Sequence, residues 1–433
     1  MKKLLLALLL IAGALNITAE NYPYRADYLW VTVPDHADWL YQCGENATVE
    51  VQFYKYGIPR DGKVSWKLAD DMLKADKQGT ATLKNGRCTV SIGSRKTPGF
   101  RDLSLALSID GKTYVHHIKV GFSVDRIMPY TQEPADFMSF WQAQKRSLRQ
   151  ELSYTRERAE EYCTDKILCD LIKLNVDGKH SIYAYLTYPR DAKPGKHPVC
   201  ICPPGAGIKT IKEPLRHKYY AENGFLRIET EIHGIDPRTP EKTFREIQSA
   251  FQTDGNNYLK NGLDNRDNYY MRHVYLSLIR TIDFAASLPE WDGKNVAFQG
   301  GSQGGALSLV AAALDGRVTQ CAANHPALAD MAGYAEQGRT GGYPHFSREK
   351  GMLTPEKTKV MAYYDVVNFA RHITCPTLMT WGYNDNTCPP TTSYAVFNVM
   401  KCEKEALLTP VNEHWTSDAT ERGLMEWIMK NLK

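Results

Sequence analysis

The sequence predicts a mostly parallel α/β fold preceded by a small all-β sandwich, and two patterns indicate this. Between residues 20 and 127, short strands of alternating polarity are separated by Asn-Gly and Asp-Gly turns. From about residue 165, continuous apolar strands alternate with amphipathic helices, which is typical of a sheet covered by helices on both faces. A length of 433 residues suffices for the two domains that these patterns imply, at residues 20–127 and 128–433.

Residues 1–19 resemble a secretory signal peptide. Lys2 and Lys3 supply the positive start, and an apolar run of 12 residues, Leu4–Leu15, follows them. Ala19 offers a small residue at the cleavage site. Because the run is too short to span a bilayer comfortably, we expect a secreted or periplasmic protein without a membrane span.

Residues 20–127 are expected to form an immunoglobulin-like β-sandwich. Val49, Val51 and Phe53 alternate with polar residues, as in a strand with one buried face. Asn85-Gly86 and Asp110-Gly111 each lie between two strand-like segments, and both dipeptides favour the positive φ angles of two-residue hairpin turns. A packing or spacer role is the simplest interpretation of this domain, and a sugar-binding role is the alternative.

Residues 128–433 carry the pattern of the α/β domain. Pro129 and Pro134 bracket a short polar stretch that separates it from the sandwich. Helices are expected over 274–285 and 306–314, where apolar residues recur. Strands are expected at residues 199–202, 225–228, 295–299, 377–381 and 406–409.

A candidate nucleophile lies between one of these strands and one of these helices. The run Gly300-Gly301-Ser302-Gln303-Gly304 is a G-x-S-x-G sequence, and it stands in the strand–turn–helix context of a nucleophile elbow. Glycine is needed there because strand and helix approach closely around a sharply turned serine. We therefore predict that Ser302 is a catalytic nucleophile.

A serine hydroxyl needs a base, and two later loops offer the partners. In α/β-hydrolases the chain order is Ser, then Asp or Glu, then His. Asp385 follows the strand at 377–381, and His414 follows the strand at 406–409. His414 would accept the proton of Ser302, and Asp385 would orient the imidazole and stabilise its charged form. The alternatives are a turn-forming aspartate and a surface histidine.

The negative oxygen of a tetrahedral intermediate needs hydrogen-bond donors. The backbone N–H of Gln303, the residue after the nucleophile, is the first candidate. The second is expected in the loop Pro204-Gly205-Ala206-Gly207, where we choose the N–H of Ala206 because proline cannot donate. The alternative for this loop is a plain glycine-rich turn.

With these residues, the chain resembles the acetyl xylan esterase and cephalosporin C deacetylase family of serine carbohydrate esterases. The resemblance spans roughly residues 130–430 and rests on Pro134-Ala135-Asp136-Phe137, Phe140-Trp141, Tyr269-Tyr270, Gly300–Gly305, Tyr364–Asn368 and Asp385 with Cys388-Pro389-Pro390. It implies an α/β-hydrolase fold, no cofactor or metal, and removal of acetyl groups from acetylated oligo- or polysaccharides. It also implies Ser302, Asp385 and His414 as the triad, and the backbone N–H groups of Ala206 and Gln303 as the oxyanion hole.

The chain departs from the family pattern at two places. Pro204-Gly205-Ala206 stands where the family usually has His-Gly-Tyr, so an aromatic wall beside the acetyl pocket would be missing. His233-Gly234 stands where the family has Arg-Gly. Segments 238–262 and 331–352 are polar and contain glycine, and we expect them to cover the serine. For Trp415, Tyr343 and Tyr383, ordinary packing is the preferred interpretation, and stacking on sugar rings is the alternative.

The same residues are compatible with functions other than acetyl ester hydrolysis. A feruloyl-type or other carboxylesterase, or a serine peptidase, would use the same scaffold, and a non-catalytic carbohydrate-binding protein is a further alternative. All three triad positions are filled, which argues against the last. A net charge of +4 is too small to indicate a nucleic-acid partner.

The sequence contains ten cysteines. Cys43–Cys88 and Cys163–Cys169 are possible disulfides, although the spacing of cysteines does not determine how they pair.

Overall fold

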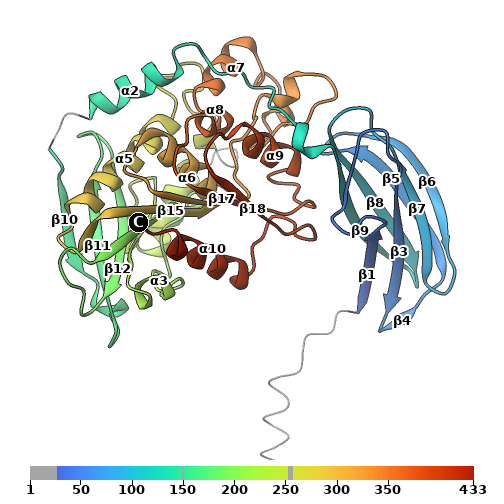
Figure 1. The fold of residues 1–433 in the computed structure, drawn as a ribbon, viewed down its shortest axis with the longest axis horizontal. Coiled ribbons are helices and arrows are strands. Elements are labelled where there is room, and N and C mark those ends of the chain that lie inside the picture. Colours follow the sequence, from blue (N-terminus) through green and yellow to red (C-terminus); the bar gives the residue numbers. More distant parts are fainter. Residues whose placement is uncertain (1–26, 149–150, 252–256) are drawn as a thin grey trace, which may run out of the picture.

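The computed structural model describes residues 27–148, 151–251 and 257–433, and the expected signal peptide at residues 1–19 lies outside these ranges. Figure 1 shows a β-rich N-terminal part, in blue, beside a larger part in which helices surround a central sheet. Among the described residues, no helix is both long enough and apolar enough to cross a membrane.

The strands described between residues 28 and 122 form two sheets. The first contains β1 (Tyr28–Pro34), β3 (Ala47–Lys55), β4 (Ile58–Pro59) and β7 (Arg87–Gly93). The second has the order β2 (Leu40–Tyr41), β9 (Lys112–Phe122), β8 (Gly99–Ile109), β5 (Gly62–Asp70), β6 (Ala75–Leu83). Alternate residues of both sheets, among them Val49, Val51 and Phe53, enclose one apolar core. This confirms the predicted β-sandwich.

The two predicted hairpin turns have different outcomes. Asp110 and Gly111, with φ angles of 52° and 73°, join β8 to β9, which pair along their full length. Asn85 and Gly86 also form a tight turn, with φ angles of 51° and 73°. Lys84 and Arg87, on either side of it, form an isolated antiparallel bridge, so the predicted two-residue turn is present. Beyond this bridge, β6 pairs with β5 and β7 pairs with β3, so the turn carries the chain from one sheet to the other. Turn residues determine the local backbone, whereas the burial of each strand determines its partner.

The larger part contains a sheet of nine strands. Its order is β10 (Tyr154–Arg158), β11 (Ile167–Asn175), β12 (Ser181–Pro189), β14 (Leu226–Thr230), β13 (His197–Cys202), β15 (Trp291–Gly301), β16 (Gln320–Asn324), β17 (Thr377–Trp381), β18 (Lys404–Leu408). The pairs from β10 to β14 are antiparallel, and those from β14 to β18 are parallel. The predicted mostly parallel sheet is therefore confirmed, with an antiparallel extension at one edge.

Helices cover both faces of this sheet. Val199 and Ile201 of β13 pack in one apolar cluster with α5 (Met271–Ser287), α6 (Gln303–Leu314), α8 (Val366–Ala370) and α9 (Pro390–Val399). Cys200 and Cys202 alternate with them and pack on the other face with α3 (Tyr219–Glu222) and α10 (Asp418–Lys430). The remaining helices are α2 (Phe137–Ser147), α4 (Glu241–Phe251), α7 (Pro355–Ala362), η1 (Val124–Arg126), η2 (Glu160–Tyr162), η3 (Asn257–Leu259), η4 (Gly333–Ala335) and η5 (Phe346–Arg348).

The ten cysteines are free thiols, so neither of the two possible disulfides is formed. Cys43 follows β2 of one sandwich sheet, whereas Cys88 belongs to β7 of the other. The sulfur of Cys163 accepts a hydrogen bond from the backbone N–H of Cys169 at 3.4 Å.

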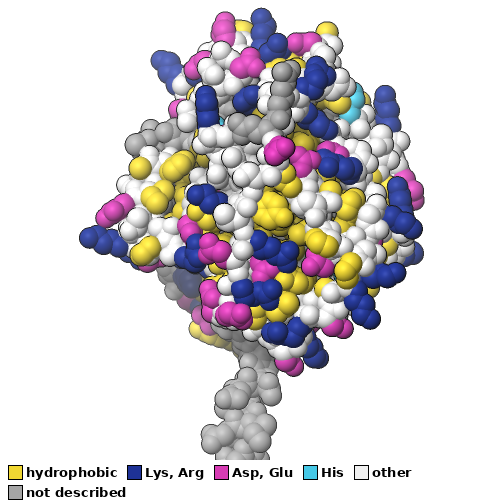
Figure 2. All heavy atoms as spheres, turned by 90° about the vertical axis from the view of Figure 1, so that its left-hand side faces the viewer, with side chains coloured by type: hydrophobic (Ala, Val, Ile, Leu, Met, Phe, Trp, Pro, Cys, Tyr) yellow, Lys and Arg dark blue, Asp and Glu magenta, His cyan; other side chains and the backbone are white. Residues whose placement is uncertain are grey.

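Charges are mixed on the face that Figure 2 shows, which is the left-hand side of Figure 1. Lysine and arginine side chains alternate there with aspartate and glutamate side chains, and apolar side chains lie between them. This face therefore carries no continuous basic patch of the kind that binds a polyanion.

A buried ion pair lies where the sandwich meets the larger part. The Nζ atom of Lys119, in β9, lies 2.8 Å from Oδ1 of Asp71, and these side chains are 0% and 1% exposed. Asp71 also accepts a hydrogen bond from the hydroxyl of Thr391 at 2.6 Å. The backbone N–H of Lys119 donates to the Asn384 side chain at 2.9 Å. Two charges without access to water thus face the loop between β17 and α9.

Replacement of Lys119 should destabilise the whole fold. In Lys119→Met, Asp71 would remain buried without its cation, and removal of one partner of a buried pair costs about 3–5 kcal/mol. We expect the free energy of unfolding in urea to fall by this amount. Lys63→Met, at an exposed position of β5, should change it by less than about 0.5 kcal/mol. Equal stabilities of the two variants would contradict the importance of the pair.

Acid should destabilise the protein between about pH 6.5 and pH 4. Burial is the largest cause that lowers the pKa of six histidines to about 3 or 4, namely His116, His217, His233, His273, His325 and His345. The unfolded chain binds more protons at these six sites in this window, so stability is lost as the pH falls. Burial raises the pKa of Glu231 and Asp365 to about 7, and that of Glu421 as well, which offsets part of the loss. Because six histidines oppose three carboxyl groups, we expect the free energy of unfolding to fall as the pH is lowered from about 6.5 to 4. Urea denaturation at a series of pH values measures this change.

Candidate active site

The turn at Ser302 has the sharp geometry that the sequence predicts. Ser302 lies between β15 and α6 with φ 59° and ψ −122°, a conformation that costs a non-glycine residue roughly 1–3 kcal/mol. Its N–H donates to the Asn324 carbonyl at 3.0 Å. Its carbonyl accepts from the N–H groups of Ala306 and Ala327, each at 3.0 Å. These three hydrogen bonds hold the strained serine against α6 and against the end of β16.

Glycines at the turn let the neighbouring segments approach closely. A Cβ atom on Gly304 would lie 2.4 Å from the carbonyl oxygen of Pro203, and one on Gly305 would lie 2.5 Å from that of Asn324. Since both contacts are with backbone, no side chain can move aside to make room. The start of α6 therefore packs directly against the loop after β13 and against the end of β16.

Ser302, His414 and Asp385 form one hydrogen-bonded chain. Nε2 of His414 lies 3.0 Å from Oγ of Ser302, and Nδ1 lies 2.8 Å from Oδ2 of Asp385. A carboxylate accepts hydrogen bonds only, so Nδ1 carries the proton, and Nε2 is free to accept from the hydroxyl. The structure thus brings together three residues that are separated by up to 112 positions in the chain.

The Asp385 carboxylate is buried and fully hydrogen-bonded. Its side chain is 0% exposed. The second oxygen, Oδ1, accepts from the backbone N–H groups of Thr387 and Cys388 at 2.7 and 2.8 Å. Hydrogen bonds to the charged form stabilise a carboxylate in a buried place. The carboxylate is therefore fixed toward His414 by the turn of its own loop.

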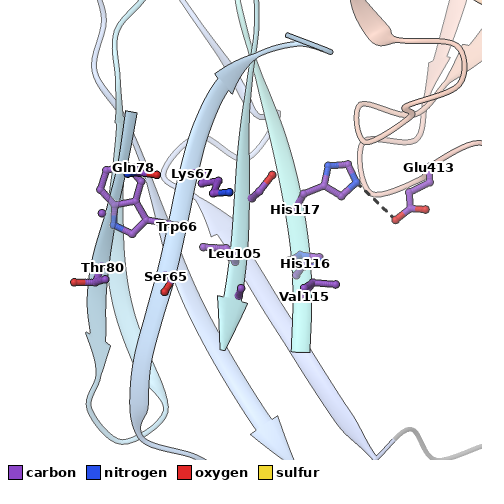
Figure 3. Close-up of a pocket in the computed structure, with 13 residues that line it drawn as sticks. Ser65, Trp66, Lys67, Gln78, Thr80, Leu105, Val115, His116, His117 and Glu413 are labelled. Atoms are coloured by element: carbon purple, nitrogen blue, oxygen red, sulfur yellow. Dashed lines mark ion pairs between the residues drawn. The ribbon is translucent and has the colours of Figure 1, made fainter. Parts of the chain in front are cut away.

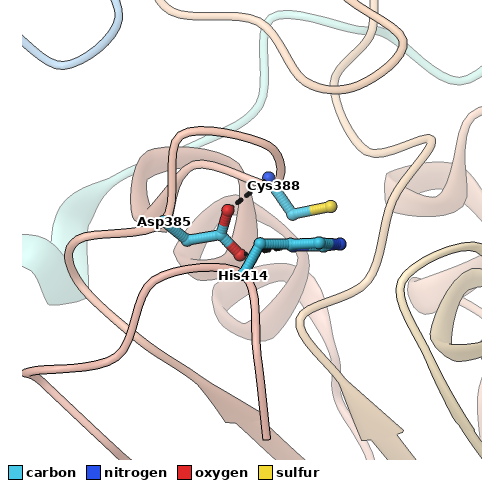
Figure 4. Close-up of side chains that lie close together, drawn as sticks. All are labelled: Asp385, Cys388 and His414. Atoms are coloured by element: carbon cyan, nitrogen blue, oxygen red, sulfur yellow. Dashed lines mark hydrogen bonds and ion pairs between the residues drawn. The ribbon is translucent and has the colours of Figure 1, made fainter.

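A thiol lies beside this arrangement. Ligand atoms of Asp385, Cys388 and His414 lie within 4.8 Å of one another, so these three groups form a possible metal-binding set (Figure 4). Burial raises the pKa of the Cys388 thiol well above its usual value, which keeps it protonated and a poor ligand. A cation at this place would also have to replace the hydrogen bond between Asp385 and His414. The donor set is therefore better suited to hydrogen bonding than to metal binding.

The sandwich contributes a hydrogen bond to the loop of Asp385. The ammonium group of Lys119 donates to the backbone carbonyl of Asp385 at 2.8 Å, in addition to its ion pair with Asp71. His345 lies 2.9 Å from the carbonyl of Thr387 through Nε2. Side chains from β9 and from the segment 331–352 thus hold the same short loop.

The loop that contains Ala206 lies beside the serine, as predicted. A Cβ atom on Gly205 would lie 4.0 Å from the Cβ of Ser302. The first residue of α6 is Gln303, whose N–H has no acceptor within its own helix. The predicted donor segments of Ala206 and Gln303 therefore both border Ser302.

Tyr258 joins these two segments, and it was not singled out by the sequence patterns. Its hydroxyl accepts from the N–H of Gly207 at 3.0 Å and donates to Oε1 of Gln303 at 2.8 Å. His233 lies 3.1 Å from the Gly207 carbonyl through Nε2 and 2.7 Å from the Tyr270 hydroxyl through Nδ1. The only signal was that Tyr258 is the single tyrosine of segment 238–262, which is expected to cover the serine, and this does not indicate where its hydroxyl lies.

The three aromatic residues proposed for sugar stacking differ in exposure. Tyr383 is 0% exposed, and its ring packs between Phe100 and Tyr394, which agrees with ordinary packing and excludes stacking on a sugar for this residue. Trp415, the residue after His414, is 52% exposed. Tyr343 is half-buried. Trp415 is therefore the aromatic side chain next to the triad that is best placed to meet a large ligand.

Comparisons with known proteins found a matching family and a similar acetyl esterase. A model of the acetyl xylan esterase (AXE1) family matches residues 122–431. The acetyl esterase Axe7A of Xylanibacter ruminicola is 57% identical over 435 residues, which cover 100% of this chain and 98% of that protein. Its similarity therefore includes the sandwich.

Two solved structures share the fold. The acetyl xylan esterase from Paenibacillus sp. R4 has a TM-score of 0.62 and 26% identity, and the match covers 71% of this chain and 98% of that chain. Acetyl xylan esterase 1 from Thermoanaerobacterium sp. JW/SL YS485 has a TM-score of 0.60 and 23% identity, with 72% and 98% coverage. The central sheet and its helices form an α/β-hydrolase fold, as the sequence predicts.

A methyl group at Gly304 should disturb the turn. Gly304→Ala would place Cβ against the Pro203 carbonyl, so we expect a loss of roughly 1–3 kcal/mol in the free energy of unfolding. Gly316→Ala is the matched control, because nothing lies within 4 Å of a Cβ atom there. Chemical denaturation of both variants measures the difference, and an unchanged Gly304 variant would show that the helix can shift freely.

Proposed function

The chain belongs to the acetyl xylan esterase family, and we propose that it is a secreted serine esterase that removes acetyl groups from acetylated oligo- or polysaccharides such as xylan and xylo-oligosaccharides. It is a carboxylic ester hydrolase. The observation that carries the proposal is the hydrogen-bonded chain from Ser302 through His414 to Asp385. Secretion rests on the pattern of residues 1–19.

In the proposed mechanism, Ser302 attacks the carbonyl carbon of the acetyl ester. Nε2 of His414 takes the hydroxyl proton as the oxygen–carbon bond forms, and Asp385 stabilises the resulting imidazolium. Collapse of the tetrahedral intermediate breaks the bond to the sugar oxygen, and His414 returns the proton to that leaving group. A water molecule then attacks the acetyl-enzyme in the same way and releases acetate. Each step uses side chains of this chain and needs no metal or organic cofactor.

The negative oxygen of the intermediate would be held by two backbone N–H groups, those of Gln303 and Ala206. Gln303 is at the start of α6, where the helix dipole also favours negative charge. Tyr258 and His233 hold the loop that contains Ala206 at the distance set by their hydrogen bonds to Gly207. Donors that are already held in place stabilise the transition state more than flexible donors, because they need no reorganisation during the reaction.

We also propose residues 20–127 and 128–433 as the two domains of the mature protein. The family match begins at residue 122, close to this boundary. The amide of Asn398, in α9, donates to the carbonyls of Val124 and Ile127 at 2.8 and 2.9 Å. These bonds support a connection that is fixed to the esterase domain rather than a free linker.

Loss of the nucleophile should abolish turnover. We expect Ser302→Ala to lower kcat for acetate release from acetylated xylo-oligosaccharides and for p-nitrophenyl acetate by roughly 10⁴-fold or more. Ser147→Ala, at the exposed end of α2, is the control and should retain full activity. Undiminished hydrolysis by folded Ser302→Ala would exclude the proposed nucleophile.

Loss of the Tyr258 hydroxyl should slow the chemical step. Tyr258→Phe leaves the Gly207 N–H and the Gln303 side chain without their shared partner, and we expect kcat to fall by about 10-fold, less than the loss for removal of a donor itself. Tyr275→Phe is the control, because it removes a buried hydroxyl that bonds the Tyr364 carbonyl at 2.8 Å within the core around α5. The control should lose stability but keep kcat, and equal kcat values in both variants would argue against a role for Tyr258.

A further inference from the structure

A row of polar side chains crosses the five-stranded sheet of the sandwich. Gln78 of β6 is the cross-strand partner of Lys67 in β5, Lys67 is the partner of Ser104 in β8, and Ser104 is the partner of His117 in β9. Their neighbours along the strands, such as Leu68, Leu103 and Ile118, face the sandwich core. The row therefore lies on the outer face, where Figure 3 shows it running from Gln78 to His117.

This row ends at the active-site loop. Nε2 of His117 lies 3.7 Å from Oε1 of Glu413, the residue immediately before His414 (Figure 3). Nδ1 of His117 lies 3.3 Å from the Asp102 carboxylate, which holds the ring at the sheet surface. The four strands of the row span three strand spacings, or about 14 Å. A linear molecule that lies along the row would reach the loop of His414.

The surface along the row is hollowed, and its polar side chains lie beside the apolar side chains of Ala106 and Val115. The row and its neighbours, including Ser65, Thr80 and Glu413, line a hollow of about 870 Å³, within the range of small-molecule sites. Gln78, Lys67 and Ser104 are exposed to solvent, and together they offer an amide, an ammonium group and a hydroxyl. These groups can donate to or accept from the hydroxyl groups of a neutral polyol.

We propose that this row is a carbohydrate-binding surface. It holds the main chain of an acetylated glycan along the sandwich while one acetyl ester of the same chain reaches Ser302. The inference rests on the proposed function, since it assigns the remainder of the substrate to the sandwich. It gives residues 20–127 a part in substrate selection, because long chains gain contacts that short ones lack.

Variants of the row test this surface by the length of the substrate. We expect Lys67→Ala/Gln78→Ala to raise KM for acetylated xylo-oligosaccharides of five or more sugars by about 5- to 10-fold, the effect of losing one or two hydrogen bonds. The ratio of kcat/KM for these chains to kcat/KM for p-nitrophenyl acetate should fall by the same factor. Thr82→Ala, on the same face of β6 but outside the hollow, is the matched control and should leave the ratio unchanged. An unchanged ratio in the double variant would overturn the proposal.

A binding measurement separates this inference from the proposed function. Ser302→Ala should bind deacetylated xylohexaose in calorimetry, and addition of the Lys67 and Gln78 substitutions should weaken that binding by about 5-fold or more. If the natural chain releases no acetate from any acetylated glycan but cleaves p-nitrophenyl acetate, the proposed substrate class is wrong. If acetate is released and binding of xylohexaose does not depend on the row, only the carbohydrate-binding surface is wrong.

Discussion

The buried contact between Lys119 and Asp71 is the constraint on which the arrangement of this molecule depends. Two opposite charges without access to water are tolerated only when geometry and hydrogen bonds compensate for the lost hydration. Here Lys119 also donates to the Asp385 carbonyl in the loop between β17 and α9, and Asp71 also accepts from the Thr391 hydroxyl in the first turn of α9. The sandwich and the loop of the triad aspartate are therefore held in one fixed relation.

Strain at the serine is tolerated for a similar reason. The unfavourable backbone conformation of Ser302 persists because β16, α6 and the loop after β13 surround it with backbone contacts that leave no room for relaxation. The Tyr258 hydroxyl then connects the two segments that carry the candidate oxyanion donors. Ser302, His414, Asp385 and the loop of Ala206 come from separate parts of the chain, and hydrogen bonds between the segments that carry them set the distances among them.

The sandwich contacts the active-site loops at two places, one buried and one open to solvent. Lys119 lies at the buried end of β9 and holds the loop of Asp385, whereas His117, two residues earlier on the same face of the strand, lies at the open end beside Glu413. Strand β9 therefore contacts both the loop of Asp385 and Glu413, the residue next to His414. This is possible because side chains two residues apart in a strand lie on the same face of the sheet.

Much of this protein follows from local sequence. The turn at Ser302 is encoded by small residues around one serine, because only glycine permits the backbone contacts at positions 304 and 305. Apolar periodicity separates the sandwich from the mostly parallel sheet, and the order of Ser302, Asp385 and His414 agrees with the hydrogen-bonded chain in the structure. These features depend on neighbours within a few residues or on a fixed chain order, so they can be predicted without a tertiary structure.

Other features were decided by the tertiary structure alone. The pairing of β6 and β7 with different sheets, the complete burial of Tyr383 and the positions of Lys119 and Tyr258 depend on surfaces that meet only after folding. A lysine in a strand or a tyrosine in a loop has the same local pattern whether it faces water or a loop hundreds of residues away. The chain therefore encoded the reacting groups locally, whereas long-range packing determined which side chains hold them in place.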